Sequence, residues 1–223
     1  KISLGRKTAS FIDLCGQLRF QKRWSQSPRI PATSVLGHMH IVALLTYISL
    51  CQNNASDARK RHGFFAALFH DLPEVLTRDI TSPIKGAVEG LDSIIKDYET
   101  RQMEEKLLPL LPKSWHWELS YYTENEFNNR VVLEGEVKTD IEFEEFAAKY
   151  SAEKFIPVDG ELIRCCDHLA ALIEASSSIK HGITSKYLQE GLQNLQSSYA
   201  NRKLGKVDFG KTFAAFTDEL IMR

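Results

Sequence analysis

The stretch FFAALFHDLPE, at residues 64–74, carries the main clue to this chain. Six apolar residues continue a helical pattern from about Ala58, and His70 and Asp71 follow at its end. Imidazole and carboxylate groups are costly to bury unless they are paired or coordinated, so both side chains need a partner. Adjacent helical residues project about 100° apart, so both can face one point only if it lies close to the helix axis. A bound metal ion meets that requirement, because its bonds to ligands are short.

Three further groups extend this pattern. Glu74 lies four residues after His70 and therefore on the same face of a helix, while Pro73 is compatible with a kink or a new helical start. His38 and His40 are two positions apart, so on a helix only one of them can join a shared site. Periodicity leaves the choice between these two histidines open. Asp167 lies inside an apolar helical run, where a carboxylate needs a partner such as a metal.

Apolar residues recur at three- and four-residue spacing through nearly the whole chain, which predicts an all-α fold in a single domain over residues 1–223. The predicted helices cover a run beginning at Thr33 or Ser34, then residues 58–69, 85–111, 143–150, 159–179, 185–199 and 209–222. Val131–Leu133 and Phe155–Val158 are the only strand-like fragments. Residues 123–140 are acidic and irregular in pattern, which predicts a mobile loop.

Composition excludes several classes of function. The 223 residues carry 28 basic and 29 acidic side chains, so no broad basic face is expected for a nucleic-acid polymer. The longest apolar stretch, 41–50, has half of the ~20 residues that a spanning helix needs, so no membrane partner is predicted. The four cysteines form no CxxC pair, which is typical of reduced thiols in a cytoplasmic protein. The basic run 59–62 is interpreted as a solvent-exposed helix start.

The order His, His-Asp, Asp on an all-α background resembles the HD-domain metal-dependent phosphohydrolases, and within them most closely the YfbR-like 5′-deoxynucleotidases. The likeness spans residues 23–182 and rests on Arg23-Trp24, on SVLGH at 34–38 with Val42-Ala43, on HDLPEVLTRD at 70–79 with SPIK at 82–85, and on CDHLAA at 166–171. Two departures stand out. Gly37 replaces a commonly acidic residue, and a longer interval before Asp167 indicates an insertion around 114–152.

The resemblance implies one divalent metal ion held by His38, His70, Asp71 and Asp167. His38 is preferred to His40 because it precedes Val42-Ala43 by the family's interval. Two nitrogen and two carboxylate ligands suit a six-coordinate Mn, Co, Fe or Mg ion better than a closed zinc site. The identity of the ion, Ni and Zn included, stays open.

The resemblance also assigns roles around the metal. Asp71 and Glu74 are the predicted catalytic residues, with Glu74 as general acid or base. The predicted substrate-binding residues are Arg23 and Lys85 at the phosphate, Asp79 at a sugar hydroxyl, and Trp24 against the sugar or base. Plainer alternatives are that Glu74 supports a ligand, that Arg23 pairs with a carboxylate and that Asp79 caps a turn.

The expected function is metal-dependent release of phosphate from nucleoside 5′-monophosphates or similar small phosphomonoesters. An HD-type phosphodiesterase or nucleoside polyphosphate hydrolase, a non-catalytic metal or nucleotide sensor, and an all-α scaffold with a fortuitous His-Asp string are the alternatives. The expected partner is a small phosphorylated substrate, with a homodimer and a cytoplasmic location implied by the resemblance. Helices in 183–223 are expected to pack on the metal-site core.

Overall fold

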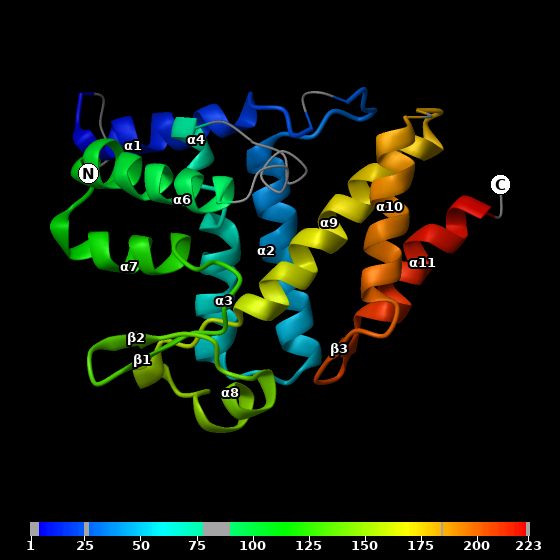
Figure 1. Cartoon of the computed structure of the whole chain (residues 1–223). Coiled ribbons are helices and arrows are strands. Elements are labelled where there is room, and N and C mark those ends of the chain that lie inside the picture. Colours follow the sequence, from blue (N-terminus) through cyan, green and yellow to red (C-terminus); the bar gives the residue numbers. More distant parts are fainter. Residues whose placement is uncertain (1–4, 25–26, 78–89, 184, 222–223) are drawn as a thin grey trace.

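The computed structural model describes residues 5–24, 27–77, 90–183 and 185–221 (Figure 1). The predicted all-α class is confirmed, since helices dominate and the strands are short. In chain order the elements are α1 (Lys7–Gly16), η1 (Gln17–Arg19), α2 (Val35–Gln52), α3 (Asp57–Phe69), α4 (Glu74–Thr77), α6 (Leu91–Gln102), η2 (Met103–Leu107), η3 (Leu108–Leu110), α7 (Lys113–Thr123), β1 (Val131–Leu133), β2 (Glu136–Lys138), α8 (Phe143–Lys149), η4 (Glu153–Phe155), α9 (Gly160–Lys180), α10 (Lys186–Tyr199), β3 (Lys203–Leu204), β4 (Val207–Asp208) and α11 (Phe209–Ile221).

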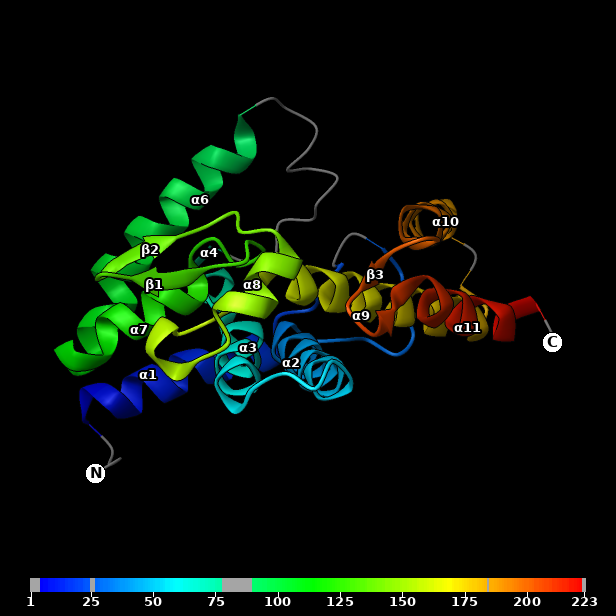
Figure 2. The same ribbon diagram turned by 90° about the horizontal axis from the view of Figure 1, so that it is seen from below.

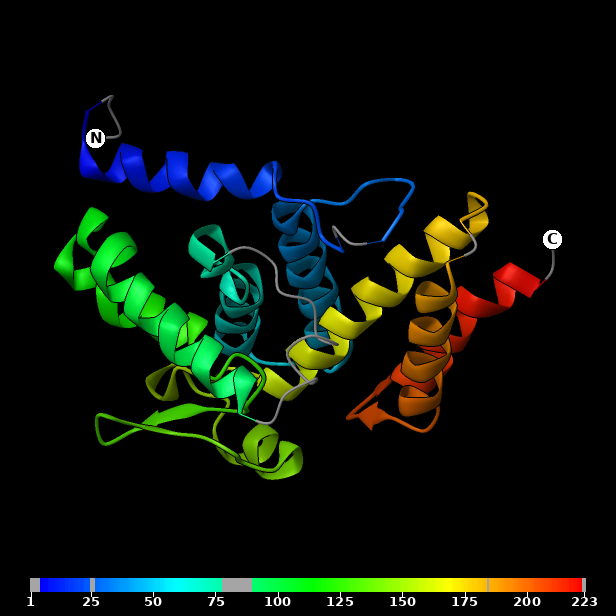
Figure 3. The ribbon, with the colours of Figure 1, turned by 45° about the horizontal axis from the view of Figure 1, so that its top comes forward.

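Helices α2, α3 and α9 form the centre of the molecule. Helix α2 packs against both α3 and α9, while α10 and α11 pack on α9 and α7 packs on α3. Figure 2 shows the β1–β2 hairpin on one side and α10 with α11 on the other, with α9 running between them. Figure 3 shows α1 ending beside the N-terminal end of α2. Three segments that are distant in sequence therefore meet at the centre.

Helix α2 begins where the sequence predicts, because the Ser34 hydroxyl accepts a hydrogen bond from the Gly37 N–H at 3.1 Å. Within the described ranges it is also the one helix long and apolar enough to cross a membrane by length and composition, and 44% of it is buried in the fold. Its Val42, Ala43 and Leu50 side chains lie in the main core. This packing fixes the face of α2 that carries His38.

Two main cores hold the helices in place. The larger joins α2, α3, α9 and α11, with Leu162, Leu172 and Phe213 among its buried members. The second lies under α1 and η2 and includes Met39, Leu72 and Leu107. Because Leu72 is buried in this second core, the chain segment between α3 and α4 is anchored directly beside His70 and Asp71.

The predicted mobile loop at 123–140 is wrong. This segment contains an antiparallel hairpin in which Val131 pairs with Lys138 and Leu133 with Glu136. Glu134 and Gly135 both have positive φ, as a two-residue hairpin turn requires. The buried Arg130 guanidinium donates hydrogen bonds to the Tyr121 and Asn125 carbonyl oxygens and so anchors the segment. Arg130, together with Val131 in a small apolar cluster with Ile141 and Phe146, therefore anchors a stretch whose composition is typical of a loop.

The predicted solvent-exposed helix start at 59–62 is also wrong for two of its members. Arg59 is 4% exposed and forms a two-pronged ion pair with Asp159, which is 0% exposed. His62 is buried and its Nδ1 lies 2.8 Å from the Tyr122 hydroxyl oxygen. The Arg59–Asp159 pair joins the start of α3 to the start of α9. Arg59 therefore joins two of the central helices, and His62 joins α3 to α7.

Candidate metal centre

The local structure at the end of α3 releases His70 and Asp71 from regular helical spacing. His70 is the C-cap of α3, and the chain then turns, with the Leu72 N–H donating to the Phe69 carbonyl oxygen and the Glu74 N–H to that of Asp71. Helix α4 starts at Glu74, directly after Pro73, which favours a new helical start. The turn places the two adjacent side chains on one point.

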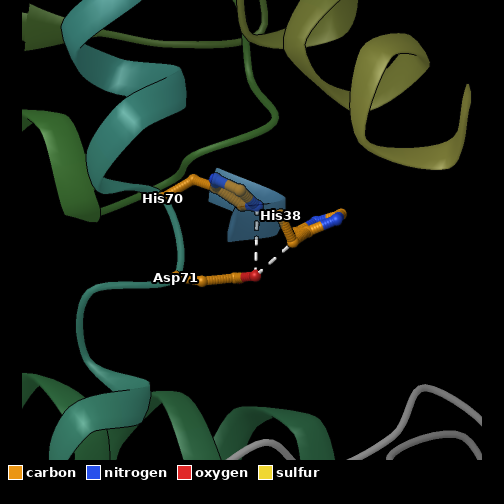
Figure 4. Close-up of side chains that lie close together, drawn as sticks. All are labelled: His38, His70 and Asp71. Carbon is orange, nitrogen blue, oxygen red and sulfur yellow. Dashed lines mark ion pairs between the residues drawn. The ribbon is translucent and has the colours of Figure 1, made fainter. Parts of the chain in front are cut away.

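Helices α2 and α9 bring the other two predicted ligands to the same point. His38 Nε2 lies 2.8 Å from Asp167 Oδ1 and 3.9 Å from Asp71 Oδ2. His70 Nε2 lies 3.2 Å from Asp71 Oδ2 and 4.0 Å from Asp167 Oδ1. Figure 4 shows the two imidazole rings beside the Asp71 carboxylate. The four residues converge although they come from three separate segments, whereas His40 is exposed to solvent.

The His70 ring is oriented for ligation. Its Nδ1–H donates to the Ala67 carbonyl oxygen at 2.7 Å, because a carbonyl oxygen can only accept. Its Nε2 is buried and makes no hydrogen bond of good geometry within the described residues, although Asp71 lies nearby. A buried ring nitrogen that faces two carboxylates without such a bond is suited to bind a cation placed between them.

The opposite charges of the site shift the pKa values of the histidines and the carboxylates, so that each favours the ionised form of the other. Burial opposes ionisation of His70, but Asp71 and Asp167 outweigh it and raise the pKa of the imidazole to about 9. Burial likewise raises the pKa of Asp167, yet hydrogen bonding and charge from His38 dominate and lower it to about 2. The pKa of Asp71 falls well below its ordinary value because His70 and Arg23 outweigh burial. Without a metal, protons on the histidines balance the carboxylates.

Arg23 and Glu174 complete the surroundings of the site. Arg23 Nη1 donates to Asp71 Oδ2 at 3.1 Å, and its Nε lies 3.7 Å from Glu174 Oε2. Arg23 thus pairs with the carboxylate of a candidate ligand, which agrees with the plainer alternative given for this residue in the sequence analysis. Glu174 was not identified as a site residue from the sequence, although it lies two helical turns after Asp167 and on the same face of α9. An acidic residue at that spacing in a buried helix was the available signal.

A cavity adjoins the candidate metal centre, and Glu74 lies in its wall. Glu74 is 6% exposed and, with His70, Asp71 and Pro73, lines a cavity of about 460 Å³ bounded by α6 and α7. Trp24 packs beside α9 and α10, with the Arg29 guanidinium 5.2 Å from its ring, and its predicted contact with the substrate stays a prediction. Asp79 and Lys85, predicted to bind substrate, lie outside the described residues.

The donor set fits a divalent metal ion. One ligand atom from each of His38, His70 and Asp71 lies within 4.8 Å of the others, and Asp167 Oδ1 approaches both ring nitrogens. Imidazole nitrogen and carboxylate oxygen are ligands of Mn, Fe, Co, Ni and Zn, and carboxylates also suit Mg. The geometry defines the class of protein as an all-α protein with a histidine–aspartate metal centre built on the α3–α4 turn.

Comparison with known protein families identifies the family of this chain. A family model described as HD domain matches residues 15–196, so the chain belongs to the HD-domain family. This confirms the predicted membership of the HD superfamily of metal-dependent phosphohydrolases. The match covers all four residues of the metal centre.

Solved structures with similar folds agree with the family. An HD phosphohydrolase from cyanophage S-2L (DatZ), bound to dA and one catalytic Zn²⁺ ion, is 15% identical, with 95% of this chain and 96% of that chain covered and a TM-score of 0.57. An HD-domain phosphohydrolase from Listeria innocua is 15% identical, with 96% and 98% covered and a TM-score of 0.63. At these identities the likeness shows a shared fold alone. Among curated proteins none matches significantly.

Proposed function

We propose that this chain is a metal-dependent phosphohydrolase that releases phosphate from nucleoside 5′-monophosphates or similar small phosphomonoesters. The observation that carries the proposal is the convergence of His38, His70, Asp71 and Asp167, with the buried Glu74 at the edge of an adjoining cavity. Membership of the HD-domain family supports it. The YfbR-like 5′-deoxynucleotidases are the proposed subgroup, on the strength of the motifs in the sequence.

The mechanism assigns each step to side chains of this chain. When bound, a divalent ion would draw charge from a phosphoryl oxygen and acidify a water molecule. His38, His70, Asp71 and Asp167 would hold that ion. Arg23 keeps Asp71 ionised and oriented through its 3.1 Å hydrogen bond. Glu74, next to His70 and Asp71 in the cavity wall, would exchange a proton with the attacking water or the leaving 5′-oxygen.

The charge of the cavity favours a monophosphate over a polyphosphate. Among the described residues its wall contains Lys96, which pairs with Glu126, and the site histidine His70, together with the carboxylates of Asp71, Glu74, Asp97, Glu99, Glu104, Glu124 and Glu126. Additional phosphate groups would be repelled by this wall, whereas sugar hydroxyls could donate hydrogen bonds to it. The dA in the cyanophage structure supports a nucleoside as the leaving group. Contacts from Arg23, Trp24, Asp79 and Lys85 to substrate stay part of the proposal.

A metal-reconstitution assay tests the proposed function. The purified chain is stripped of metal, and Mn, Co, Mg, Fe, Ni or Zn is added back separately. Phosphate release is then measured with deoxynucleoside and nucleoside 5′-monophosphates, a cyclic nucleotide, a nucleoside triphosphate and an aryl phosphate. Metal-dependent turnover that is highest on monophosphates is expected. Preference for the cyclic nucleotide or the triphosphate would favour the alternative activities, and metal binding without turnover on any ester would favour a sensor.

The homodimer and the cytoplasmic location stay predictions. Ile41, Leu44 and Ile48 form an exposed apolar stripe on α2, a kind of surface that a second copy would cover. Light scattering during size-exclusion chromatography of the wild type and of Ile48→Glu tests the homodimer. A wild-type dimer that Ile48→Glu dissociates is expected, and a monomeric wild type would contradict it.

A further inference from the structure

Glu174 lies directly behind the candidate ligand His38. Its Oε1 is 3.3 Å from His38 Nδ1, the ring nitrogen that points away from Asp167. Its Oε2 accepts a hydrogen bond from Arg29 Nη1 at 3.1 Å. The side chains of His38, Glu174 and Arg29 are 0%, 9% and 4% exposed. The three groups therefore form a buried chain that ends at the metal centre.

The chemistry of Glu174 fixes the protonation of the ring. Two guanidinium groups face this carboxylate, since Glu174 Oε2 lies 3.1 Å from Arg29 Nη1 and 3.7 Å from Arg23 Nε. An ionised carboxylate only accepts hydrogen bonds, so His38 Nδ1 must carry the proton. The lone pair of Nε2 is then available at the centre once its own proton is displaced. Ala67 does the same for His70 through a carbonyl oxygen.

Arg29 is poorly explained by stability alone. Its Nε and Nη2 atoms are buried and make no hydrogen bond to any of the described residues. A buried ion pair with incompletely satisfied donors generally gains little over apolar residues of similar volume. However, Arg29 donates to Glu174 Oε2, and the other carboxylate oxygen, Oε1, is the one that faces His38 Nδ1. Orientation of this carboxylate is the evident result of the arrangement.

We infer that Glu174, held by Arg29, is a positioning residue for the metal ion, because it fixes the ring orientation and tautomer in which His38 offers Nε2 as a ligand. The inference rests on the proposed metal site and adds residues outside the ligand set. Carboxylates that hold a ligating histidine in this way typically contribute 10- to 100-fold in metal affinity.

Cobalt binding to the whole chain tests the inference without an activity assay. Glu174→Met preserves length but removes the acceptor, so Co²⁺ affinity should fall about 10- to 100-fold and the visible Co²⁺ spectrum should change. Glu174→Gln keeps a carbonyl acceptor and should lose less. The matched control is Glu161→Met, because Glu161 lies on the same helix and pairs with Arg202. Its Co²⁺ affinity and spectrum should equal those of the wild type.

A second variant tests whether Arg29 acts through Glu174. Arg29→Met should weaken Co²⁺ binding in the wild-type background but add nothing in the Glu174→Met background. Thermal unfolding of the metal-free variants reports whether they fold. If the wild type binds Co²⁺ and Glu174→Met binds it with unchanged affinity and spectrum, or if the two losses add fully, the inference is wrong. A wild-type chain that binds no Co²⁺ contradicts the proposed function itself.

Discussion

His38 Nε2 lies 2.8 Å from Asp167 Oδ1, although 129 positions separate the two residues along the chain. The contact joins α2 to α9 at the centre of the fold, beside His70 and Asp71. Two imidazoles and two carboxylates gathered in a buried space require a positive charge between them. In the metal-free protein protons supply that charge, and a divalent ion would replace them. This competition gives the first prediction.

Metal binding should release protons at pH 7. The raised pKa of His70, about 9 against an ordinary 6.5, means that this ring is protonated at pH 7 in the metal-free chain. An imidazole must be neutral to bind a metal, so binding displaces at least one proton from the histidines, and the apparent affinity should rise about tenfold for each pH unit up to about 9.

Calorimetry in two buffers of different ionisation enthalpy measures the protons released. The expected result is a heat of binding that depends on the buffer in the wild type and depends on it less in His70→Gln. A wild-type chain that binds metal with the same heat in both buffers would show that the histidines are already neutral, contrary to this account.

Removal of the Glu74 carboxylate should separate catalysis from metal binding. We expect Glu74→Gln to lower kcat by about 10²- to 10⁴-fold, the usual contribution of a general acid or base, while metal content stays unchanged. Glu105→Gln is the matched control, because Glu105 lies in η2, is exposed to solvent and is not among the residues that line the cavity, so its kcat should equal that of the wild type. Loss of metal from Glu74→Gln would assign this residue to support of the ligands instead.

Loss of the Asp159 carboxylate should destabilise the fold without altering the site directly. Asp159→Ala leaves Arg59 buried without its partner, which should cost about 3–5 kcal/mol of unfolding free energy. Urea unfolding followed by circular dichroism measures this change. The double variant Arg59→Met with Asp159→Ala should recover part of the loss. Unchanged stability of Asp159→Ala would show that the ion pair does not fasten α3 to α9.

Two glycines should respond in opposite directions to alanine. A Cβ at Gly160 would overlap the Asn128 backbone, so Gly160→Ala should cost about 3 kcal/mol or more. Gly191 lies inside α10 with open space around its Cβ position, so Gly191→Ala should gain up to ~1 kcal/mol from helix propensity. Urea unfolding of both variants tests this contrast. Equal effects would contradict the close approach of α9 to Asn128.

Much of the fold could be predicted because its helices are long and periodic. The predicted helices at 58–69, 159–179, 185–199 and 209–222 correspond to α3, α9, α10 and α11 within a few residues. Helix α1 and the β3–β4 hairpin were not predicted. Both are short, and α1 contributes only a partly buried apolar face to the second core. Segments of this length depend on tertiary packing more than on local pattern.

The candidate site was predictable where adjacent residues carried the signal. His70 and Asp71 could be identified because they end an apolar helix, whereas the choice of His38 over His40 needed the family resemblance. The structural roles of Arg59 and Arg130 could not be predicted, because the sequence does not distinguish a buried arginine from an exposed one. The spacing of Glu174 to Asp167 was a usable signal, but the contacts of Glu174 with His38 and Arg29 could not be predicted because both partners are more than 100 positions away.

Metal content after equilibrium dialysis tests the central claim most directly. Wild-type chain, His70→Ala and Asp167→Asn are dialysed against Mn²⁺ or Co²⁺ and analysed by mass spectrometry of the metal, with Asp57→Asn as a matched control because Asp57 is fully exposed. The account predicts one ion per chain in the wild type and in Asp57→Asn, and a large loss in the other two variants. A wild type without metal, or full metal content in His70→Ala and Asp167→Asn, would contradict it.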